Sequence, residues 1–242
     1  MRRLDTALFE KSLARSRTNA RQVIENGFVR VNNKVILKPS YMVDCENDLI
    51  ETEYQEKYVS RGAYKLLQAF DEFDISVEGM TVLDAGASTG GFTQVLLEKK
   101  AEKVFAVDVG TNQLDHAIRN DCRVISMENT DIRQIDKHLQ HNCIEFATCD
   151  LSFISIEKTA HSIYQVMKEK ARAVFLIKPQ FEAGRSNIGK KGVVRDESVR
   201  KMCVENISEY LISVGFNILG LTECITQGTD GNKEYLVYIE KA

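Results

Sequence analysis

The segment Thr81–Gln94, TVLDAGASTGGFTQ, has the residue types of a nucleotide-binding turn. A strand-like apolar run ends at Asp84, glycines follow it, and Phe92 begins a stretch with helical spacing. Glycine permits a tight turn and close approach of a ligand, and the N–H groups at a helix N-terminus attract a carboxylate or phosphate. Asp108 follows the next strand-like run, at about the offset where a carboxylate meets ribose hydroxyls in βαβ units. The pattern predicts a site for an adenosine-bearing cofactor.

The turn departs from two well-known nucleotide motifs. It is not G-x-G-x-x-G, because Ala87-Ser88-Thr89 fills its middle, and it lacks the G-K-[S/T] ending of a P-loop. NAD and nucleoside triphosphates are therefore disfavoured. Asp84 would repel a pyrophosphate but suits the cationic amino-acid end of S-adenosylmethionine, which favours a methyltransferase. The alternative is that the glycines serve only the geometry of a βα turn.

Four charged residues stand at positions where such a ligand would lie. Asp150 ends one apolar strand-like run, Lys178 ends another, Glu234 opens the last one, and Lys65 lies one turn into a helix. Each of them taken alone is more often a surface charge. Lys178 is harder to dismiss, because burying a lysine at the end of so apolar a strand is costly unless the charge is paired.

The elements that must position these residues alternate from Val82 onward. Strands are expected at 81–84, 103–108, 122–126, 145–149, 172–178, 216–224 and 234–240. Helices fill most gaps, and the clearest runs from Asp196 as N-cap to Val214, with Gly215 as its stop. Five βα alternations and a terminal hairpin predict an α/β fold, a Rossmann-like, doubly wound and mostly parallel seven-stranded sheet. Ligands should lie outside the C-terminal ends of its strands.

The N-terminal residues differ from the rest in charge. Residues 1–40 hold nine basic side chains against three acidic ones, although the whole chain carries a net charge of −3. The pattern there is a short helix, a second helix with Ser16 as N-cap, and two short strands around Asn32-Asn33. A basic module on a mildly acidic body suggests a polyanion-binding appendage, with a solvated helix face as the alternative.

This helix–helix–hairpin module resembles the small RNA-binding domain shared by a small-subunit ribosomal protein, several pseudouridine synthases and tyrosyl-tRNA synthetases. In that domain the second helix and the V-x-V-N turn face RNA phosphates, so shape and backbone are recognised. The resemblance implies these RNA-facing residues: Arg2, Arg3, Arg15, Arg17, Arg21, Arg30 and Lys34. We expect a small α+β RNA-binding domain at 1–53, a linker at 54–61 and the α/β domain at 62–242.

Together with the glycine turn, the four charged residues resemble the Lys-Asp-Lys-Glu tetrad of the FtsJ-type RNA ribose 2′-O-methyltransferases. The chain is most similar to the TlyA family, haemolysin A-like rRNA methyltransferases that join the same RNA-binding module to an FtsJ-like domain. The most specific matching pieces are SRGAYKL at 60–66, DAGASTGGFT at 84–93, AVDVGTNQL at 106–114, CDLSFIS at 149–155, KPQFEAGR at 178–185, GVVRD at 192–196 and GNKEYL at 231–236. Two positions depart from the family pattern, Ala63 and Asp131, where relatives often have Gly and Asn.

The resemblance implies an S-adenosylmethionine-dependent enzyme that methylates a ribose 2′-hydroxyl of ribosomal RNA or ribosomal subunits. The implied cofactor-binding residues are Asp84, Gly86, Ala87, Ser88, Gly90, Gly91, Phe92, Asp108, Val109 and Asp131. Lys178 is expected to orient and deprotonate the hydroxyl, with its pKa lowered by burial and a neighbouring cation. Asp150 would hold that ammonium, and Lys65 and Glu234 would position the nucleotide. No metal is required.

Composition limits the other hypotheses. The 242 residues are 43% apolar and 28% charged, which is ordinary for a soluble protein. No apolar run approaches a membrane span and no signal sequence is recognisable. Six cysteines without a C-x-x-C pair or a His cluster indicate a cytoplasmic protein without a metal site. The remaining alternatives are an RNA- or ribosome-binding protein with an inactive methyltransferase fold, and a haemolysin-like membrane-active protein. The oligomeric state is left open.

Overall fold

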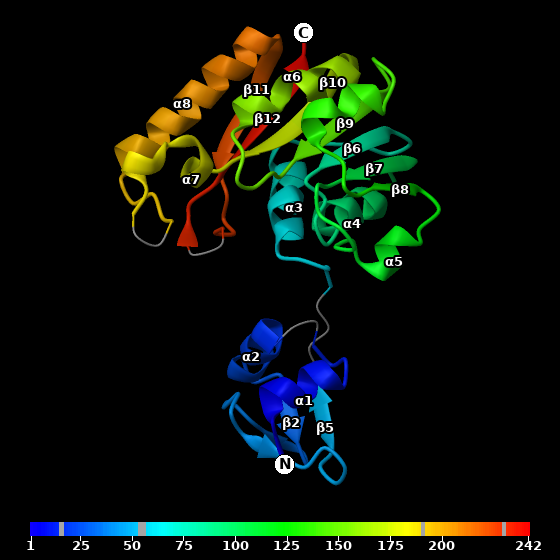
Figure 1. The fold of residues 1–242 in the computed structure, drawn as a ribbon, viewed down its shortest axis with the longest axis vertical. Helices are drawn as coiled ribbons and strands as arrows, with labels where there is room; N and C mark the ends of the chain where they lie inside the picture. The colour runs from blue at the N-terminus through cyan, green and yellow to red at the C-terminus, as the bar shows by residue number, and fades with distance from the viewer. Residues whose placement is uncertain (15–16, 53–56, 190–191, 229–230) are drawn as a thin grey trace. The chain divides into compact units, whose positions relative to one another are not determined.

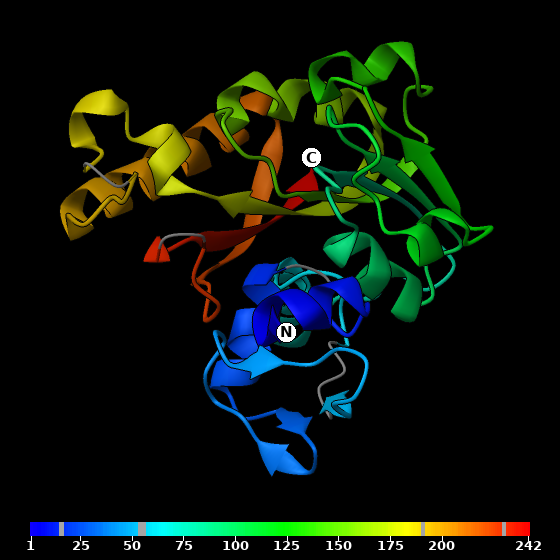
Figure 2. The ribbon, with the colours of Figure 1, turned by 60° about the horizontal axis from the view of Figure 1, so that its bottom comes forward.

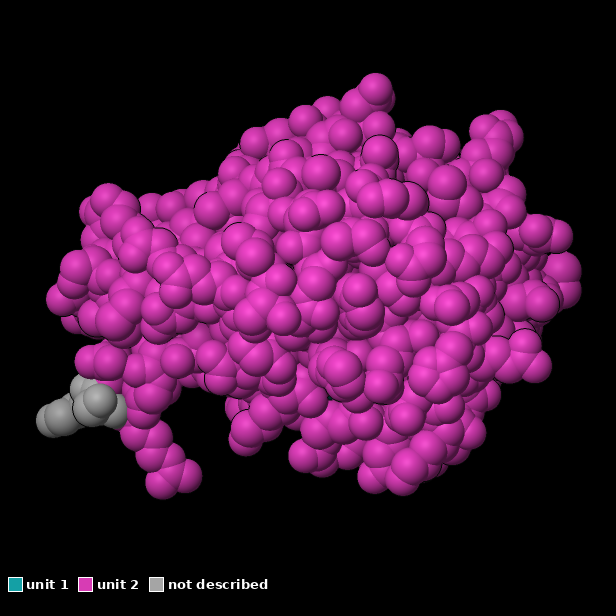
Figure 3. All heavy atoms as spheres, turned by 90° about the horizontal axis from the view of Figure 1, so that it is seen from above, with its two compact units in different colours: residues 1–57 teal, residues 58–242 magenta. Residues whose placement is uncertain are grey.

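The chain forms two compact units, residues 1–57 and 58–242 (Figure 1). The computed structural model describes residues 1–14, 17–52, 57–189, 192–228 and 231–242. Arg15 and Ser16, which carry an expected RNA contact and an expected helix cap, lie outside the described residues. Figure 3 shows one face of the second unit, which forms a continuous packed surface.

The second half of the expected linker, 54–61, packs into the second unit. Tyr58 is only 2% exposed and lies in the core of the second unit. Its hydroxyl donates to Glu98 Oε2 at 2.8 Å, and the Val59 N–H donates to Gln94 Oε1 at 2.8 Å. The second unit therefore begins at Tyr58, because an aromatic side chain and two hydrogen bonds fix this stretch to helix α4 (Gly91–Glu98).

The first unit is a small α+β body. Its elements are β1 (Arg2–Arg3), α1 (Leu4–Glu10), α2 (Arg17–Glu25), β2 (Val29–Val31), β3 (Lys34–Val35), β4 (Met42–Val43) and β5 (Ile50–Thr52). Strands β3, β2 and β5 form one antiparallel sheet, and β1 pairs with β4. Asn32 and Asn33 have φ values of 50° and 65°, which is the conformation of a two-residue hairpin turn. The expected Asn-Asn hairpin is confirmed, whereas β1 and β4 were not expected.

A seven-stranded sheet organises the second unit (Figure 2). Its strands are β6 (Thr81–Ala85), β7 (Lys103–Val107), β8 (Val124–Met127), β9 (Ile144–Cys149), β10 (Met167–Ile177), β11 (Phe216–Glu223) and β12 (Tyr235–Lys241). Their order is β11-β12-β10-β9-β6-β7-β8, and β12 runs antiparallel to both of its neighbours. The expected Rossmann-like, mostly parallel sheet is confirmed. Strand β10 begins five residues earlier than expected, with a register shift between Met167 and Arg172.

Helices cover both faces of this sheet (Figure 1). They are α3 (Gly62–Glu72), α4 (Gly91–Glu98), α5 (His116–Arg119), η1 (Ile132–Lys137), η2 (Ile156–Lys158), α6 (Ala160–Val166), α7 (Pro179–Glu182), η3 (Arg185–Asn187) and α8 (Glu197–Val214). Consecutive strand residues point to opposite faces, so Val82 packs with α3 and α4 whereas Leu83 packs with α6 and α8. The result is a three-layer α/β/α unit with one apolar core on each side of the sheet.

The caps of α8 follow the sequence closely. The Asp196 side chain accepts a hydrogen bond from the Ser198 N–H at 2.8 Å, which satisfies a donor that the first helical turn leaves free. Gly215 ends the helix with a φ of 116°, a conformation that glycine adopts without a steric penalty. The expected start and stop of this helix are both confirmed.

Candidate active site

A cavity of about 660 Å³ opens at the C-terminal ends of the central parallel strands of the second unit. Strands β6, β9 and β10 run in the same direction and end at this edge, and the antiparallel β12 begins there. Residues that are distant in the chain therefore converge. The cavity wall includes Ser60, Lys65, Gly86, Ala87, Ser88, Thr89, Gly91, Phe92, Asp150, Ser152, Phe153, Lys178, Gln180, Phe181 and Glu234.

The four charged residues come together as two ion pairs. Lys65 Nζ lies 2.5 Å from Glu234 Oε2, with side-chain exposures of 10% and 3%. Lys178 Nζ lies 2.6 Å from Asp150 Oδ1, with exposures of 9% and 19%. Burying an ion is costly, and pairing offsets that cost only with good geometry and further hydrogen bonds. Two such pairs in the wall of one cavity are more than the fold itself requires.

Lys178 is in contact with an anion, a hydroxyl group and an aromatic ring. Besides Asp150, its Nζ donates to Ser152 Oγ at 2.9 Å and lies 5.9 Å from the centre of the Phe181 ring. The charged group that contacts Lys178 is thus the carboxylate of Asp150, and Lys65 is bound to Glu234. The contact between Asp150 and the Lys178 ammonium agrees with the expectation, and the neighbouring cation stays a prediction.

The glycine turn lies directly against Asp150, the residue that follows β9. Gly86 has a φ of 88°, and a Cβ atom there would lie 2.4 Å from the backbone oxygen of Asp150. Any larger residue would therefore push the turn away from β9 or force a strained backbone. The absence of a side chain at Gly86 allows the expected cofactor turn to approach the backbone of Asp150, the expected catalytic residue.

Asp84 lies behind the turn and is not part of the cavity wall. Its side chain is fully buried, and it accepts hydrogen bonds from Thr93 Oγ1 at 2.6 Å and Thr148 Oγ1 at 2.8 Å. Burial raises the pKa of this carboxyl to about 6, against the lowering effect of the two hydroxyls. Asp84 is therefore tied to α4 through Thr93 and does not border the cavity.

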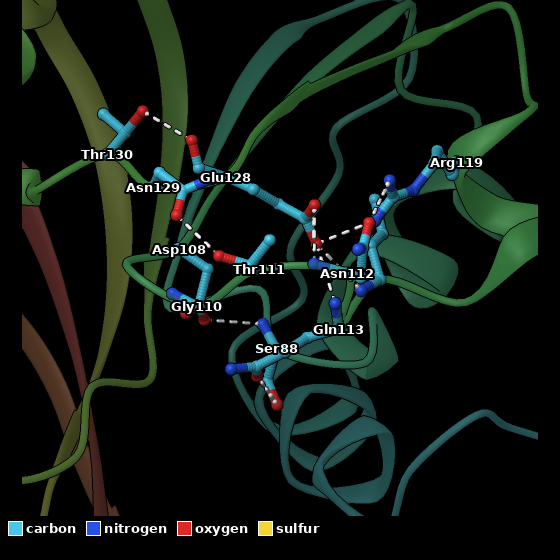
Figure 4. A network of polar contacts seen from close by, with 11 residues as sticks. Ser88, Asp108, Gly110, Thr111, Asn112, Gln113, Arg119, Glu128, Asn129 and Thr130 are labelled. Carbon is cyan, nitrogen blue, oxygen red and sulfur yellow. Dashed lines mark hydrogen bonds and ion pairs between the residues drawn. The ribbon is translucent and has the colours of Figure 1, made fainter.

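Asp108 fixes the turn from the neighbouring strand (Figure 4). Its Oδ2 accepts from the Ser88 N–H at 2.8 Å and its Oδ1 accepts from the Gly110 N–H at 2.7 Å. An ionised carboxylate has about four acceptor positions, so both oxygens keep capacity for the hydroxyls of a ribose. The structure places Asp108 beside the cavity wall, to which it is joined through Ser88.

Sequence reasoning missed Glu128, which organises the same region. Its carboxylate accepts from the N–H groups of Asn112, Gln113 and Leu114 at 3.0, 2.8 and 3.2 Å, and it pairs with Arg119 at 2.8 Å (Figure 4). One acid thus holds the loop that follows Asp108. The sequence offered only an acidic residue after a strand, a signal too common to single out.

Other expected cofactor residues lie farther from the cavity. Asp131 pairs with Arg133 at 2.5 Å, which keeps the pKa of this carboxyl below its usual value. Val109 is 69% exposed, and neither residue belongs to the cavity wall. Gly90 caps α4 with a φ of 97° and faces Leu114 and Ile118. Val109 and Asp131 lie in the loops that follow β7 and β8, and Gly90 faces the first of these loops and α5. None of the three contacts the two ion pairs among the contacts of the described residues.

Several cavity residues were not singled out from the sequence, and Phe153 and Gln180 are two of them. Phe153 is 91% exposed and has a φ of 64°, and its ring lies 5.1 Å from that of Phe181. Gln180 donates from Nε2 to Glu234 Oε1 at 2.9 Å. Both lie within motifs that carried the resemblance, but nothing in the sequence shows which of their side chains reach the cavity.

In the first unit, a buried carboxylate holds two of the expected RNA-facing arginines. Asp5 is fully buried, and its oxygens accept from Arg3 at 3.0 and 2.8 Å and from Arg21 at 3.2 Å. These bonds, with that of Arg3 the strongest, keep the pKa of Asp5 well below its usual range. Arg2 pairs with Glu10 at 2.9 Å, and Arg17 and Lys34 are exposed. Arg30 is half-buried in β2.

Comparison with known proteins agrees with this geometry. Residues 58–241 match the family model of FtsJ-like methyltransferases, and residues 2–50 match the S4 domain. The chain belongs to the FtsJ-like methyltransferase family. Within it, the chain is 42% identical to "Hemolysin A" of Brachyspira hyodysenteriae over 98% of both chains. It is 37% identical to "16S/23S rRNA (cytidine-2'-O)-methyltransferase TlyA" of Mycobacterium tuberculosis, over 98% of this chain and 89% of that one. The predicted family is confirmed.

The solved structures extend the likeness of this FtsJ-like methyltransferase to three dimensions. A candidate hemolysin of Streptococcus thermophilus superimposes with a TM-score of 0.77 at 37% identity, over 99% of this chain and 88% of that one. Among the residues described, no helix combines the length and the apolar character that crossing a membrane demands.

Proposed function

We propose that this FtsJ-like methyltransferase transfers a methyl group from S-adenosylmethionine to a ribose 2′-hydroxyl of ribosomal RNA in the cytoplasm. The observation that carries the proposal is the pair of buried lysine–carboxylate contacts in the wall of the cavity that the glycine turn also borders. The relative named TlyA, a 16S/23S rRNA (cytidine-2'-O)-methyltransferase, supports this substrate. A catalytically inactive RNA-binding protein would have no need to keep two buried charge pairs.

The residues at the glycine turn fit S-adenosylmethionine. The turn approaches Asp150 as closely as a residue without Cβ permits, and Asp108 keeps acceptor positions beside Ser88. We assign Gly86, Ala87, Ser88, Gly91 and Phe92 to its methionine end. Asp108 would bind the cofactor ribose, and Val109 and Asp131 would lie near adenine. Asp84 and Gly90 would act indirectly, through charge and loop shape. When bound, this cofactor supplies an electrophilic methyl group on a positively charged sulfur.

The residues of the two ion pairs would bind and activate the ribose 2′-hydroxyl that accepts the methyl group. A ribose 2′-hydroxyl ionises far above neutral pH, so its oxygen becomes a good nucleophile only as the proton leaves. Lys178 would bind the hydroxyl and take its proton. Asp150, at 2.6 Å, would then stabilise the ammonium that forms. Lys65 and Glu234 would position the nucleotide, and alignment of oxygen and methyl should contribute much of the rate acceleration.

We assign the first unit to RNA binding. The S4 match and the cluster of arginines on Asp5 support a surface that contacts phosphates. Arginine presents a planar set of donors that suits phosphate oxygens. Such contacts fix the register on the RNA without reading its sequence. The choice of nucleotide then falls to the cavity of the second unit.

The test is transfer of labelled methyl to isolated small subunits, large subunits and naked rRNA. Label in one RNA, at one nucleotide that resists alkaline cleavage, is the expected result, because a 2′-O-methyl group removes the nucleophile of that cleavage. Lys178→Met should lower transfer by about 100- to 10,000-fold, while calorimetry shows unchanged cofactor affinity. Lys100→Met is the matched control, since Lys100 is an exposed lysine paired with Glu78.

Three outcomes would contradict this proposal. The absence of label on every RNA, with cofactor binding intact, would support the non-catalytic hypothesis. Label without resistance to alkali would indicate methylation of a base. Equal loss of transfer and of cofactor affinity in Lys178→Met would reject the role given to Lys178.

A further inference from the structure

Gln180 is a cavity residue whose amide orientation is fixed by its neighbours. Its Nε2 donates to Glu234 Oε1 at 2.9 Å, while Glu234 Oε2 pairs with Lys65 at 2.5 Å. A carboxylate that is paired with a lysine only accepts hydrogen bonds, so the amide nitrogen, and not the oxygen, must face Glu234. The remaining atom, Oε1, is therefore assigned by chemistry and turns away from Glu234.

That oxygen is a buried acceptor. Gln180 Oε1 exposes less than 1 Å² and meets no hydrogen-bond donor among the residues that the structure describes. Folded proteins rarely leave a buried acceptor unpaired, because the acceptor has given up its hydrogen bonds to water. Since Gln180 forms part of the cavity wall, a molecule in the cavity is the natural source of the missing donor.

The backbone around Gln180 holds this acceptor in place. Helix α7 begins directly after Lys178, and the Phe181 N–H donates to the Lys178 carbonyl oxygen at 2.8 Å. Glu182 anchors the other end of α7, where its Oε1 accepts from the Ile156 N–H at 3.0 Å. A rigidly held acceptor discriminates between ligands better than a mobile one, because the side chain cannot turn to water or to another partner.

The order of the strands shows which ligand lies nearest. Across the sheet the order is β7, β6, β9, β10, β12. Asp108 follows β7 and the glycine turn follows β6, whereas Gln180 follows β10 and contacts Glu234 at the start of β12. Strand β9 separates the two groups. Gln180 therefore belongs to the side of the cavity that we assign to the acceptor nucleotide.

We propose that Gln180 Oε1 accepts a hydrogen bond from the RNA substrate and that Gln180 is a specificity-determining residue. The proposal rests on the RNA methyltransferase function given above. Phosphates offer no donor, the 3′-oxygen lies in a phosphodiester, and the target 2′-hydroxyl is engaged at Lys178. The donors that remain are an N–H group of the target base and the 2′-hydroxyl of an adjacent nucleotide. The two sources share the same chemistry, and substrates that lack one or the other distinguish them.

The test combines one substitution with altered RNAs. Gln180→Met keeps the length of the side chain and removes both hydrogen-bonding groups, and Gln165→Met, on α6 away from the cavity, is the control. Once the methylated nucleotide is mapped, a synthetic RNA fragment around it is compared with two analogues. One lacks the N–H donor of the target base, and the other has 2′-deoxy sugars at the adjacent nucleotides. The values measured are kcat/KM for RNA, RNA affinity with S-adenosylhomocysteine present, and affinity for S-adenosylhomocysteine alone.

The expected result is a loss that depends on the substrate. The wild-type protein should lose about tenfold in kcat/KM on one of the two analogues, as expected for an unpaired buried acceptor. Gln180→Met should lose about tenfold on the parent RNA and nothing further on that analogue. Its affinity for S-adenosylhomocysteine should equal that of the wild-type protein. The analogue that shows the effect identifies the donor as base or ribose.

Two results would overturn the proposal. Unchanged kcat/KM and RNA affinity in Gln180→Met would show that Gln180 does not contact RNA. An equal loss on all three RNAs would show that Gln180 acts only by holding Glu234. If the wild-type protein methylates no RNA at all, the proposed function fails. Binding of short oligo(C), oligo(U) and oligo(dC) then still tests Gln180, since equal affinities of both proteins for all three probes would reject it.

Discussion

Asp84 should destabilise the folded protein at neutral pH, and Asp84→Asn should remove that effect. The carboxyl is fully buried and bonded by hydroxyls, and burial raises its pKa from 3.8 to about 6. The ionised form is therefore less favourable in the folded chain than in the unfolded chain. Asparagine has the same shape and carries no charge at any pH.

The size and sign of the effect follow from linkage. The pKa rises from 3.8 to about 6, a difference of about 2.2 pKa units. One pKa unit corresponds to about 1.36 kcal/mol, so the ionised carboxyl lowers the free energy of unfolding by about 3 kcal/mol. Between these two pH values the folded chain binds more protons than the unfolded chain, so the contribution of Asp84 to stability falls as pH rises. Below pH 3.8 the contribution vanishes, and above pH 6 the full cost of about 3 kcal/mol applies.

The assay is urea unfolding of the wild-type protein and Asp84→Asn at several pH values from 4 to 8. The chain has no tryptophan, so circular dichroism is the appropriate signal. Other carboxyls, such as Asp5, titrate in both proteins and cancel in the difference. The changed bonds to Thr93 and Thr148 add a term that does not vary with pH. The difference between pH 4 and pH 8 therefore isolates the ionisation of Asp84.

The reasoning is refuted if the difference in unfolding free energy between the two proteins stays constant from pH 4 to pH 8. A change of the opposite sign would also refute it, because Asp84 would then be more acidic in the folded state. Urea unfolding of the Asp84→Glu variant gives a further check. Its longer side chain cannot keep both hydroxyl bonds without moving α4, so it should be less stable than the wild-type protein at every pH.

Two further predictions concern carboxylates that position other groups. Glu128→Gln should weaken binding of S-adenosylhomocysteine about tenfold in calorimetry and leave kcat at saturating cofactor unchanged, because the amide cannot accept all three N–H groups of the loop after Asp108. The exposed Glu102→Gln should change neither value, and a lowered kcat in Glu128→Gln would contradict the assignment. Asp5→Asn should lower the melting temperature of the first unit at pH 7, where its bonds to Arg3 and Arg21 contribute fully. The lowered pKa of Asp5 means that this wild-type advantage shrinks as pH falls below 3.8, and an advantage that persists there would contradict it.

Much of the fold could be predicted because its signals are local. Strands β6, β7, β9, β11 and β12 coincide with apolar runs of the sequence. Both ends of α8 carry residues with strong positional preferences. The start of β10 could not be predicted, since Lys168, Glu169 and Lys170 are typical of a loop. They continue the strand only because Met167 pairs with β9 before the register shifts.

The residues of the site could be predicted, and so could the contact between Asp150 and Lys178, but the contacts of Glu234 could not. The strand ends indicated Asp150, Lys178 and Glu234 separately. Lys65 and Glu234 are 169 positions apart, and only the strand order decides that they meet. The same limit applies to Gln180, whose neighbour in sequence, Phe181, packs against Lys178 while Gln180 itself reaches Glu234. Local pattern does not determine which side chain of a four-residue helix turns toward a cavity.

A buried acid that costs stability suggests a use for its charge. The pKa of about 6 means that Asp84 is about half protonated near pH 6. A cation bound over the glycine turn would favour the ionised form and lower this pKa. Binding of S-adenosylmethionine at pH 6 should therefore release protons, and neutral-sulfur S-adenosylhomocysteine should release fewer. Calorimetry in two buffers of different ionisation enthalpy measures both, and Asp84→Asn should abolish the difference. Equal proton release for the two ligands would mean that Asp84 does not sense the sulfonium and that its cost has another cause.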